Sequence, residues 1–195
     1  ALLMWLWQDA SPRESAWLGL LFNAGTFSAG TYWLLLSLPL GGAPLWLALF
    51  LLLGLTGIMA LYHAGLGYAC ARWLPRAGAL RSLVALPAAW LLVEWWRGWF
   101  LSGFSWLSLG YSQTDTWLAG LAPVAGVYGV SAALLLSAGA LVALVSGTQR
   151  ARVSAVAVLL AVNLVAGWVF SLAAGVAALA VLLGWQRVRT GVLAV

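Results

Sequence analysis

The residues of this sequence that most clearly suggest a functional site are an acid and a base three residues apart. Glu94 and Arg97 begin a segment, ending at Asp115, that is rich in tryptophan, glycine and hydroxyl side chains. Residues spaced i and i+3 share one helix face, where they can form an ion pair. The chain around them is 65% hydrophobic and 7% charged, with a mean hydropathy of +1.03. Because charge in hydrocarbon is costly, this pair predicts a functional site inside an integral membrane protein.

The composition excludes several other kinds of chemistry. All nine basic residues are arginines, so no reaction that needs a lysine can use these residues. His63 and Cys70 are the sole histidine and cysteine, so we expect no intrachain disulfide, no metal site of the Cys/His type and no cofactor. We interpret Cys70 as a buried or interfacial structural thiol. The arginines are scattered singly between apolar runs, which argues against a nucleic-acid partner.

Long apolar runs between the charged residues predict an all-α fold, a polytopic transmembrane helix bundle. A helix needs ~20 apolar residues to cross a ~30 Å hydrocarbon core. We expect about six full spans and a partial N-terminal span at residues 1–7. The full spans are expected at about 16–38, 44–70, 82–101, 119–147, 153–170 and 171–186.

The arginines predict the orientation of this bundle. If the loops alternate sides, eight of the nine arginines fall on one side, which the positive-inside rule makes cytoplasmic. The opposite loops, at 39–44 and 102–118, contain no arginine. The eight are Arg13, Arg72, Arg76, Arg81, Arg150, Arg152, Arg187 and Arg189.

The apolar run from Val153 to Gly184 is too long for one upright span. Its 32 residues would measure about 48 Å as a helix at ~1.5 Å per residue. One span would also place Arg187 and Arg189 on the wrong side of the membrane. Two spans leave no residues for a turn. We therefore expect two spans, with a segment missing between Phe170 and Ser171 on the non-cytoplasmic side.

The segment 102–118 is predicted to be an irregular loop or re-entrant segment that roofs the bundle. Its glycines and hydroxyl residues are untypical of a lipid-facing helix. Irregular backbone near membrane depth is tolerated only where it is buried in protein or lines a wet cavity.

The same segment resembles a motif of a known family. The motif consists of EWWRGW at 94–99, SGFSW at 102–106, GYSQTD at 110–115 and LAGLAPV at 118–124, followed by GVYGVS at 126–131, with GTFSAGTYW at 25–33. These residues closely resemble the membrane domain of bacterial apolipoprotein N-acyltransferase. The resemblance extends over about residues 1–170.

The resemblance implies a domain organisation and a location. In that family, eight spans surround a periplasmic nitrilase-like domain inserted between the seventh and eighth, and the junction inferred at Phe170 and Ser171 coincides with that insertion. Residues 1–170 would be the membrane domain from a partial second span through the seventh span, and residues 171–195 the final span and cytoplasmic tail. The protein would be a multi-pass protein of the bacterial inner membrane, with its functional face in the periplasm.

The resemblance also implies an activity. The family transfers an acyl chain from a phospholipid such as phosphatidylethanolamine to the N-terminal amine of diacylglyceryl-cysteine in lipoproteins, through a thioester acyl-enzyme. Its catalytic triad is a Glu, a Lys and a Cys of the nitrilase-like domain. Because this chain has no lysine, we expect no catalytic residue here and an inactive isolated chain that positions lipid substrates. The alternatives are a non-catalytic membrane scaffold, a lipid- or lipoprotein-binding module, or a small transporter, although the sequence lacks a transporter's internal repeats.

Several side chains are candidates to contact lipid substrates. Glu94 and Arg97 are interpreted as a structural pair, but the planar fork of Arg97 could instead bind a lipid phosphate. The tryptophans could form an aromatic belt or wall an acyl-chain groove. Tyr111 and Gln113 could contact head groups or satisfy the amides of their own loop. The candidates are Arg97, Trp99, Phe104, Trp106, Tyr111 and Gln113.

Overall fold

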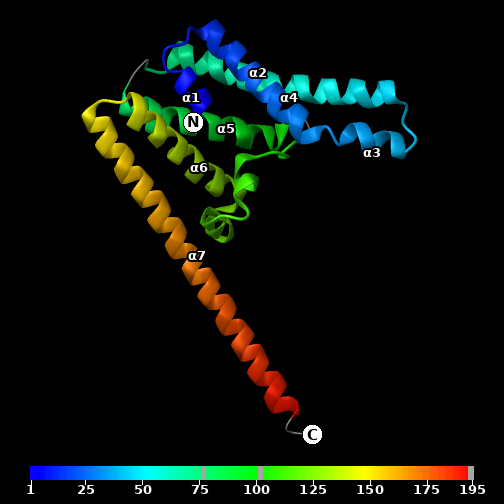
Figure 1. The fold of residues 1–195 in the computed structure, drawn as a ribbon, viewed down its shortest axis with the longest axis vertical. Helices are drawn as coiled ribbons and strands as arrows, with labels where there is room; N and C mark the ends of the chain where they lie inside the picture. Colours follow the sequence, from blue (N-terminus) through cyan, green and yellow to red (C-terminus); the bar gives the residue numbers. More distant parts are fainter. Residues whose placement is uncertain (76–77, 101–102, 193–195) are drawn as a thin grey trace.

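The structure of this chain is a computed structural model that describes the backbone of residues 1–75, 78–100 and 103–192, and the side chains of those residues up to Val181. All regular elements in these ranges are helical, which confirms the predicted all-α fold (Figure 1). The α-helices are α1 (Leu2–Leu6), α2 (Pro12–Thr31), α3 (Leu34–Leu40), α4 (Leu45–Trp73), α5 (Leu86–Arg97), α6 (Ala122–Ser146) and α7 (Gln149–Val192). A π-helix, η1 (Arg81–Ala85), precedes α5, and two 3-10 helices, η3 (Leu109–Gln113) and η4 (Trp117–Leu121), precede α6.

Three helices in the described residues are long and apolar enough to cross a membrane. They are Leu45–Trp73, Trp117–Ser146 and Gln149–Val181. The first two correspond to the spans predicted at 44–70 and 119–147. The span predicted at 16–38 is divided into α2 and α3, and the span predicted at 82–101 consists of η1 and α5.

The start of α2 is defined by local side-chain chemistry. The Ser11 hydroxyl accepts a hydrogen bond from the backbone N–H of Glu14 at 3.4 Å, and the Glu14 carboxylate accepts one from the N–H of Ser11 at 2.8 Å. This reciprocal capping box, with Pro12 in the first turn, satisfies N–H groups that have no partner within the helix. The same bonds favour the charged carboxylate, so they lower the pKa of Glu14 below its usual value.

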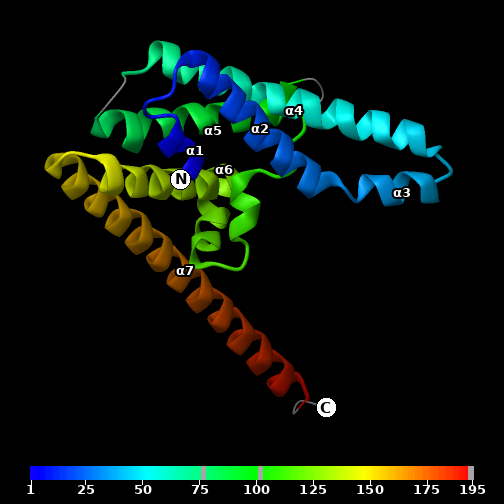
Figure 2. The same cartoon turned by 45° about the horizontal axis from the view of Figure 1, so that its top comes forward.

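Glycines allow α2 and α4 to lie close together (Figure 2). A Cβ atom at Gly19 would collide with the carbonyl group of His63, and one at Gly67 would collide with that of Ser15. The indole N–H of Trp7 donates to the same Ser15 carbonyl oxygen at 2.9 Å. Small residues are how membrane helices bring their backbones into contact, because hydrocarbon solvent gives no hydrophobic drive for association.

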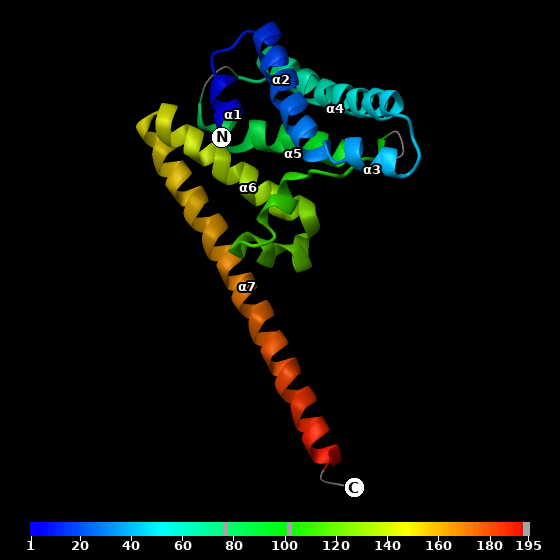
Figure 3. The same ribbon diagram turned by 45° about the vertical axis from the view of Figure 1, so that its right-hand side comes forward.

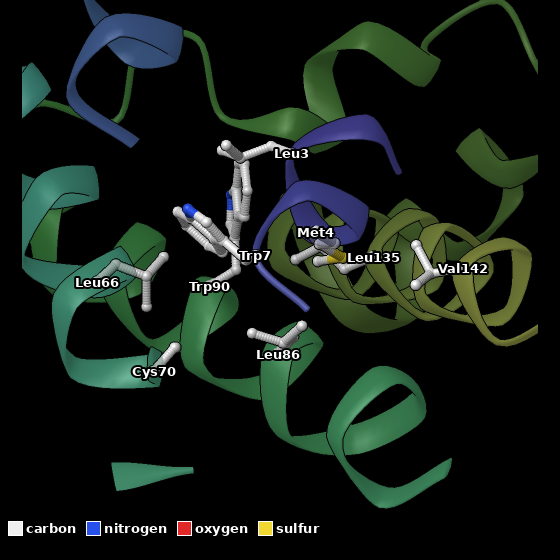
Figure 4. Packing of buried hydrophobic residues seen from close by; sticks show 9 residues of the cluster. All are labelled: Leu3, Met4, Trp7, Leu66, Cys70, Leu86, Trp90, Leu135 and Val142. Atoms are coloured by element: carbon white, nitrogen blue, oxygen red, sulfur yellow. The ribbon is translucent and has the colours of Figure 1, made fainter. Parts of the chain in front are cut away.

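The main apolar core surrounds α1. Trp7 is 1% exposed and lies against Trp90, with ring centroids 6.1 Å apart. Figure 4 shows that this cluster joins α1 to α4, α5 and α6. Its members are Leu3, Met4, Trp7, Leu66, Cys70, Leu86, Trp90, Leu135 and Val142. Cys70 is buried within it, in agreement with a structural thiol.

A buried arginine joins the helix ends at one end of the bundle. The Arg81 guanidinium donates to the carbonyl oxygens of Pro75 at 2.7 Å and Trp7 at 2.8 Å. These carbonyls follow α4 and α1, where the helix dipoles leave partial negative charge that compensates the guanidinium. A cavity of about 180 Å³ beside this contact is lined by Ser82 and by residues of α6 and α7, among them Ser146 and Ala151.

Several of the arginines predicted to be cytoplasmic belong to helix ends at this same end of the bundle. Arg13 lies at the start of α2, Arg72 at the end of α4 and Arg81 at the start of η1. Arg150 and Arg152 lie at the start of α7, which begins beside these ends (Figure 1). Arg76 lies outside the described residues.

The C-terminal part of the chain differs from its prediction. The residues expected as two spans, at 153–170 and 171–186, form one continuous helix in the structure. Positions 170 and 171 contain neither glycine nor proline, and the Ser171 hydroxyl donates to the Gly167 carbonyl oxygen of the preceding turn at 2.8 Å. Once a helix exists, each further residue adds a hydrogen bond at little cost, so α7 continues through the junction.

The continuous α7 also changes where the chain ends. Its 44 residues extend about 66 Å at ~1.5 Å per residue. Arg187 and Arg189 therefore belong to the end of α7 opposite Arg150 and Arg152, contrary to the predicted common side. Figure 3 shows α7 leaving the bundle as a straight rod. Its packing ends at the predicted junction, because every residue from Phe170 to Val181 is exposed.

Candidate functional site

The candidate site is built on the last turn of α5. Glu94 is 2% exposed and Arg97 is 3% exposed. Arg97 Nη2 lies 4.0 Å from Glu94 Oε1, which is the i, i+3 pairing that their spacing predicts. Both charges are therefore removed from solvent at the point where the regular helix ends.

Both charged side chains hold the segment that follows α5. The backbone N–H of Leu109 donates to Glu94 Oε1 at 2.5 Å. Arg97 Nη1 donates to the Trp106 carbonyl oxygen at 2.9 Å, and Arg97 Nη2 lies 3.5 Å from the Ser108 hydroxyl oxygen. Charge-assisted bonds of this kind are stronger than neutral ones, so the pair fixes the course of this irregular segment.

The segment from 103 to 121, which we call the roof loop, is irregular as predicted for 102–118. Leu107 has a φ of 60°, in the left-handed region that a non-glycine residue seldom adopts. The Leu107 side chain fills space beside Gly30 of α2, where a Cβ would collide with it. The Gly110 N–H donates to the Ser131 hydroxyl of α6 at 2.8 Å. Ser102, the first predicted residue of the loop, lies outside the described residues, as does Leu101.

The surroundings of Arg97 leave little room for a lipid head group. Its guanidinium carbon lies 5.1 Å from the centroid of the Phe27 ring, a cation–π contact. The Phe104 ring also lies near the Phe27 ring, with centroids 6.0 Å apart. Because its terminal nitrogens contact the roof loop and its face covers Phe27, this geometry favours the structural role of Arg97 over phosphate binding.

The predicted aromatic candidates are in different places. Trp99 is half exposed and contacts Trp95 and Trp96 edge to face, with centroids 5.4 and 4.7 Å away. Phe104 is only partly exposed. Trp106 and Tyr111 are exposed and line one cavity of about 380 Å³ on the roof loop. The fold thus brings Trp106 and Tyr111 together and leaves Trp99 outside this cavity.

Gln113 is engaged within the roof loop. Its amide nitrogen donates to the Ser112 hydroxyl at 2.9 Å, and its amide oxygen lies 3.2 Å from the Thr116 hydroxyl. This geometry favours a role in satisfying the loop itself. Ser105 and Leu107 also line the Trp106–Tyr111 cavity and were absent from the predicted candidates. Their position beside Trp106 in the sequence was the one signal that could have identified them.

Comparison with known proteins agrees with this architecture. The model of the family described as "Apolipoprotein N-acyltransferase N-terminal domain" matches residues 1–140. The chain is 43% identical to the apolipoprotein N-acyltransferase of Methylococcus capsulatus over 178 residues, covering 78% of this chain and 34% of that protein. It is 43% identical to that of Pseudomonas putida over 168 residues, covering 85% and 33%, and 41% identical to that of Vibrio vulnificus over 142 residues, covering 72% and 28%.

The chain spans about a third of the length of these relatives. The family match extends from α1 to residue 140 in α6 and therefore contains the buried pair and the roof loop. By this match, the chain belongs to the apolipoprotein N-acyltransferase family and contains its N-terminal domain.

Proposed function

We propose that this chain is the substrate-positioning membrane portion of an apolipoprotein N-acyltransferase. The observation that carries the proposal is the family match over residues 1–140, together with relatives of that name at about 40% identity. The whole enzyme would transfer an acyl chain from a phospholipid to the N-terminal amine of a diacylglyceryl-cysteine.

The proposed reaction has two steps. A thiolate attacks the acyl ester carbonyl of the phospholipid, forming a thioester and releasing a lysophospholipid. The deprotonated lipoprotein amine then attacks the thioester, which forms an amide and returns the thiolate. The groups for both steps would belong to a nitrilase-like domain outside these residues, inserted near Phe170 and Ser171. Cys70 is a poor candidate for the thiolate, because it is buried in the apolar core.

The roof loop supplies the proposed contact with lipid. Trp106 and Tyr111 are each about half exposed and line a cavity of about 380 Å³, a volume within the range of small-molecule sites. Both rings have an apolar body and a polar edge, which suits the boundary between acyl chains and head groups. Glu94 and Arg97 hold the roof loop in place through their hydrogen bonds to its backbone. We place it on the periplasmic side of the inner membrane, opposite the end where the arginines gather.

An acyl-transfer assay with mass spectrometry tests the proposal. The full-length protein is incubated with phosphatidylethanolamine and a diacylated lipopeptide, and a triacylated product is expected. The isolated 195-residue chain is expected to give none, since it has no lysine for the proposed triad. A triacylated product from this chain alone would overturn the proposed location of the chemistry. Binding of the lipopeptide by the full-length protein without any product would favour the scaffold alternative.

Substitution of Trp106 tests the role of the cavity. In the full-length protein, Trp106→Ala is expected to raise the KM for phosphatidylethanolamine about tenfold, equivalent to about 1.4 kcal/mol of binding free energy, with a smaller change in kcat. Trp17→Ala is the matched control, because Trp17 is also an exposed tryptophan but lies on α2 outside the cavity. Equal KM values for the two variants would contradict a lipid contact at Trp106.

A further inference from the structure

A small cavity with mainly apolar walls and a few polar groups lies below the roof loop. It measures about 60 Å³ and is bounded by residues of α2, α4, α5 and the roof loop. Trp90 contributes part of its apolar wall, and its polar lining residues are Asn23, Thr26, His63, Glu94 and Arg97. The His63 ring stands edge-on to Trp90, with centroids 4.6 Å apart.

Four buried polar atoms on the walls of this cavity have no hydrogen-bond partner among the described residues. They are both ring nitrogens of His63, Oε2 of Glu94 and Nε of Arg97. His63 is 4% exposed, and the other two side chains are 2% and 3% exposed. An unpaired polar group in a dry apolar interior is strongly disfavoured, so four such atoms around one space indicate that something fills it.

The size and chemistry of the cavity identify its occupant as water. A water molecule takes about 30 Å³ in the liquid, so 60 Å³ corresponds to about two molecules. Glu94 Oε2 needs a donor, Arg97 Nε needs an acceptor, and a neutral imidazole needs one of each. Water supplies both functions, whereas a simple ion supplies one. The carboxylate and guanidinium compensate each other, so the cavity does not call for an added charge.

We propose that this cavity binds about two ordered water molecules that bridge His63, Glu94 and Arg97. The water hydrates Glu94 Oε2 and Arg97 Nε, the atoms of the ion pair that have no hydrogen-bond partner among the described residues. Glu94 Oε1 accepts from Leu109, and Arg97 Nη1 donates to Trp106. Hydration of the remaining atoms keeps both side chains directed toward those partners, so His63 acts as a positioning residue for the roof loop through water.

Hydroxyl-radical footprinting of the purified protein in lipid nanodiscs tests the presence of water. Radicals generated by radiolysis of a bound water oxidise the adjacent side chains. Trp90 lines the cavity, and Trp7 is the matched control, because it is also a buried tryptophan of the same core but does not line the cavity. Trp90 is expected to be oxidised several-fold faster than Trp7. Equal rates for the two rings would overturn the proposal.

The His63→Phe substitution distinguishes a wet cavity from a dry one by the direction of the change in Tm. If water is bound, phenylalanine displaces it and leaves Glu94 Oε2 and Arg97 Nε unpaired, so the Tm falls and Trp90 oxidation slows. If the cavity is dry, the substitution removes two unpaired nitrogens, so an unchanged or higher Tm would overturn the proposal.

Thr56→Val is the matched control for the stability measurement. The Thr56 hydroxyl on α4 is also buried and has no hydrogen-bond partner within the described part of the chain, but Thr56 does not line the cavity. The Tm of Thr56→Val is therefore expected to stay unchanged or rise. If His63→Phe does not fold, the oxidation rates of Trp90 and Trp7 in the wild-type protein decide whether the cavity contains water. Neither measurement depends on acyl transfer, so failure here is distinguishable from failure of the proposed function.

Discussion

Replacing Glu94 with glutamine tests the buried ion pair that supports the roof loop. Glutamine keeps the shape of the side chain and can still accept from Leu109, but it removes the negative charge that lies 4.0 Å from Arg97. Removing one partner of a buried pair costs about 3–5 kcal/mol, because the surviving charge is left uncompensated. Since Arg97 still donates to the Trp106 carbonyl oxygen at 2.9 Å, we expect the lower limit, about 3 kcal/mol.

Thermal unfolding in detergent micelles measures this loss. For a chain of this size, each kcal/mol changes the Tm by about 2–4 °C, so Glu94→Gln is expected to lower it by about 6–12 °C. Glu14→Gln is the matched control, because Glu14 is exposed and glutamine also completes a capping box. Its Tm is expected to stay near that of the wild type.

A double-mutant cycle separates the ion pair from other effects of the substitution. In Glu94→Gln/Arg97→Met both charges are absent, so the double variant is expected to be more stable than the sum of the single effects by about 2 kcal/mol. Additive effects, or a Glu94→Gln variant as stable as Glu14→Gln, would refute the interpretation that these two charges stabilise each other.

Three further predictions follow from local geometry. Arg97→Lys is expected to lower the Tm by an amount equivalent to about 1–3 kcal/mol, because an ammonium group cannot reproduce the planar, forked hydrogen bonding of the guanidinium. A melting curve like that of the wild type would count against a role of Arg97 in holding the roof loop. Gly67→Val is expected to lower the free energy of unfolding by about 1–3 kcal/mol through overpacking. Gly65→Val, at a position with open space around it, should leave the stability nearly unchanged. Equal stabilities of the two variants would contradict the close contact of α2 and α4. Because hydrogen bonds from Ser11, chiefly from its backbone N–H, lower the pKa of Glu14, the capping box stabilises α2 above the usual carboxyl pKa and loses this effect as pH falls through the lowered value. An NMR titration in which Glu14 has the usual carboxyl pKa would refute this reasoning.

Local sequence was sufficient to predict the features that depend on neighbouring residues. The long apolar runs at 44–70 and 119–147 predicted α4 and α6, because a backbone in hydrocarbon must satisfy its own hydrogen bonds. The i, i+3 spacing of Glu94 and Arg97 predicted their pairing on α5. Glycines and hydroxyl residues predicted the irregular backbone that the structure has at 103–118.

The C-terminal helix shows where a local pattern was insufficient. Hydropathy and the positive-inside rule predicted two helices around Phe170, but the structure has one. Both descriptions satisfy the backbone hydrogen bonds of an apolar run, and the residues at the junction do not force a turn. The end of packing at Phe170 nevertheless falls where the sequence placed a boundary.

By itself, the sequence determined that this chain is a helical membrane protein with an acid and a base beside an irregular loop. Only the tertiary structure decided that Arg97 binds the carbonyl of Trp106, that Trp106 and Tyr111 share a cavity, and that His63 meets the ion pair around a common space. The physical reason is the range of the interactions. Helix formation follows from hydropathy and hydrogen bonds within a few residues, whereas the partners of a buried polar side chain come from segments that only packing brings together.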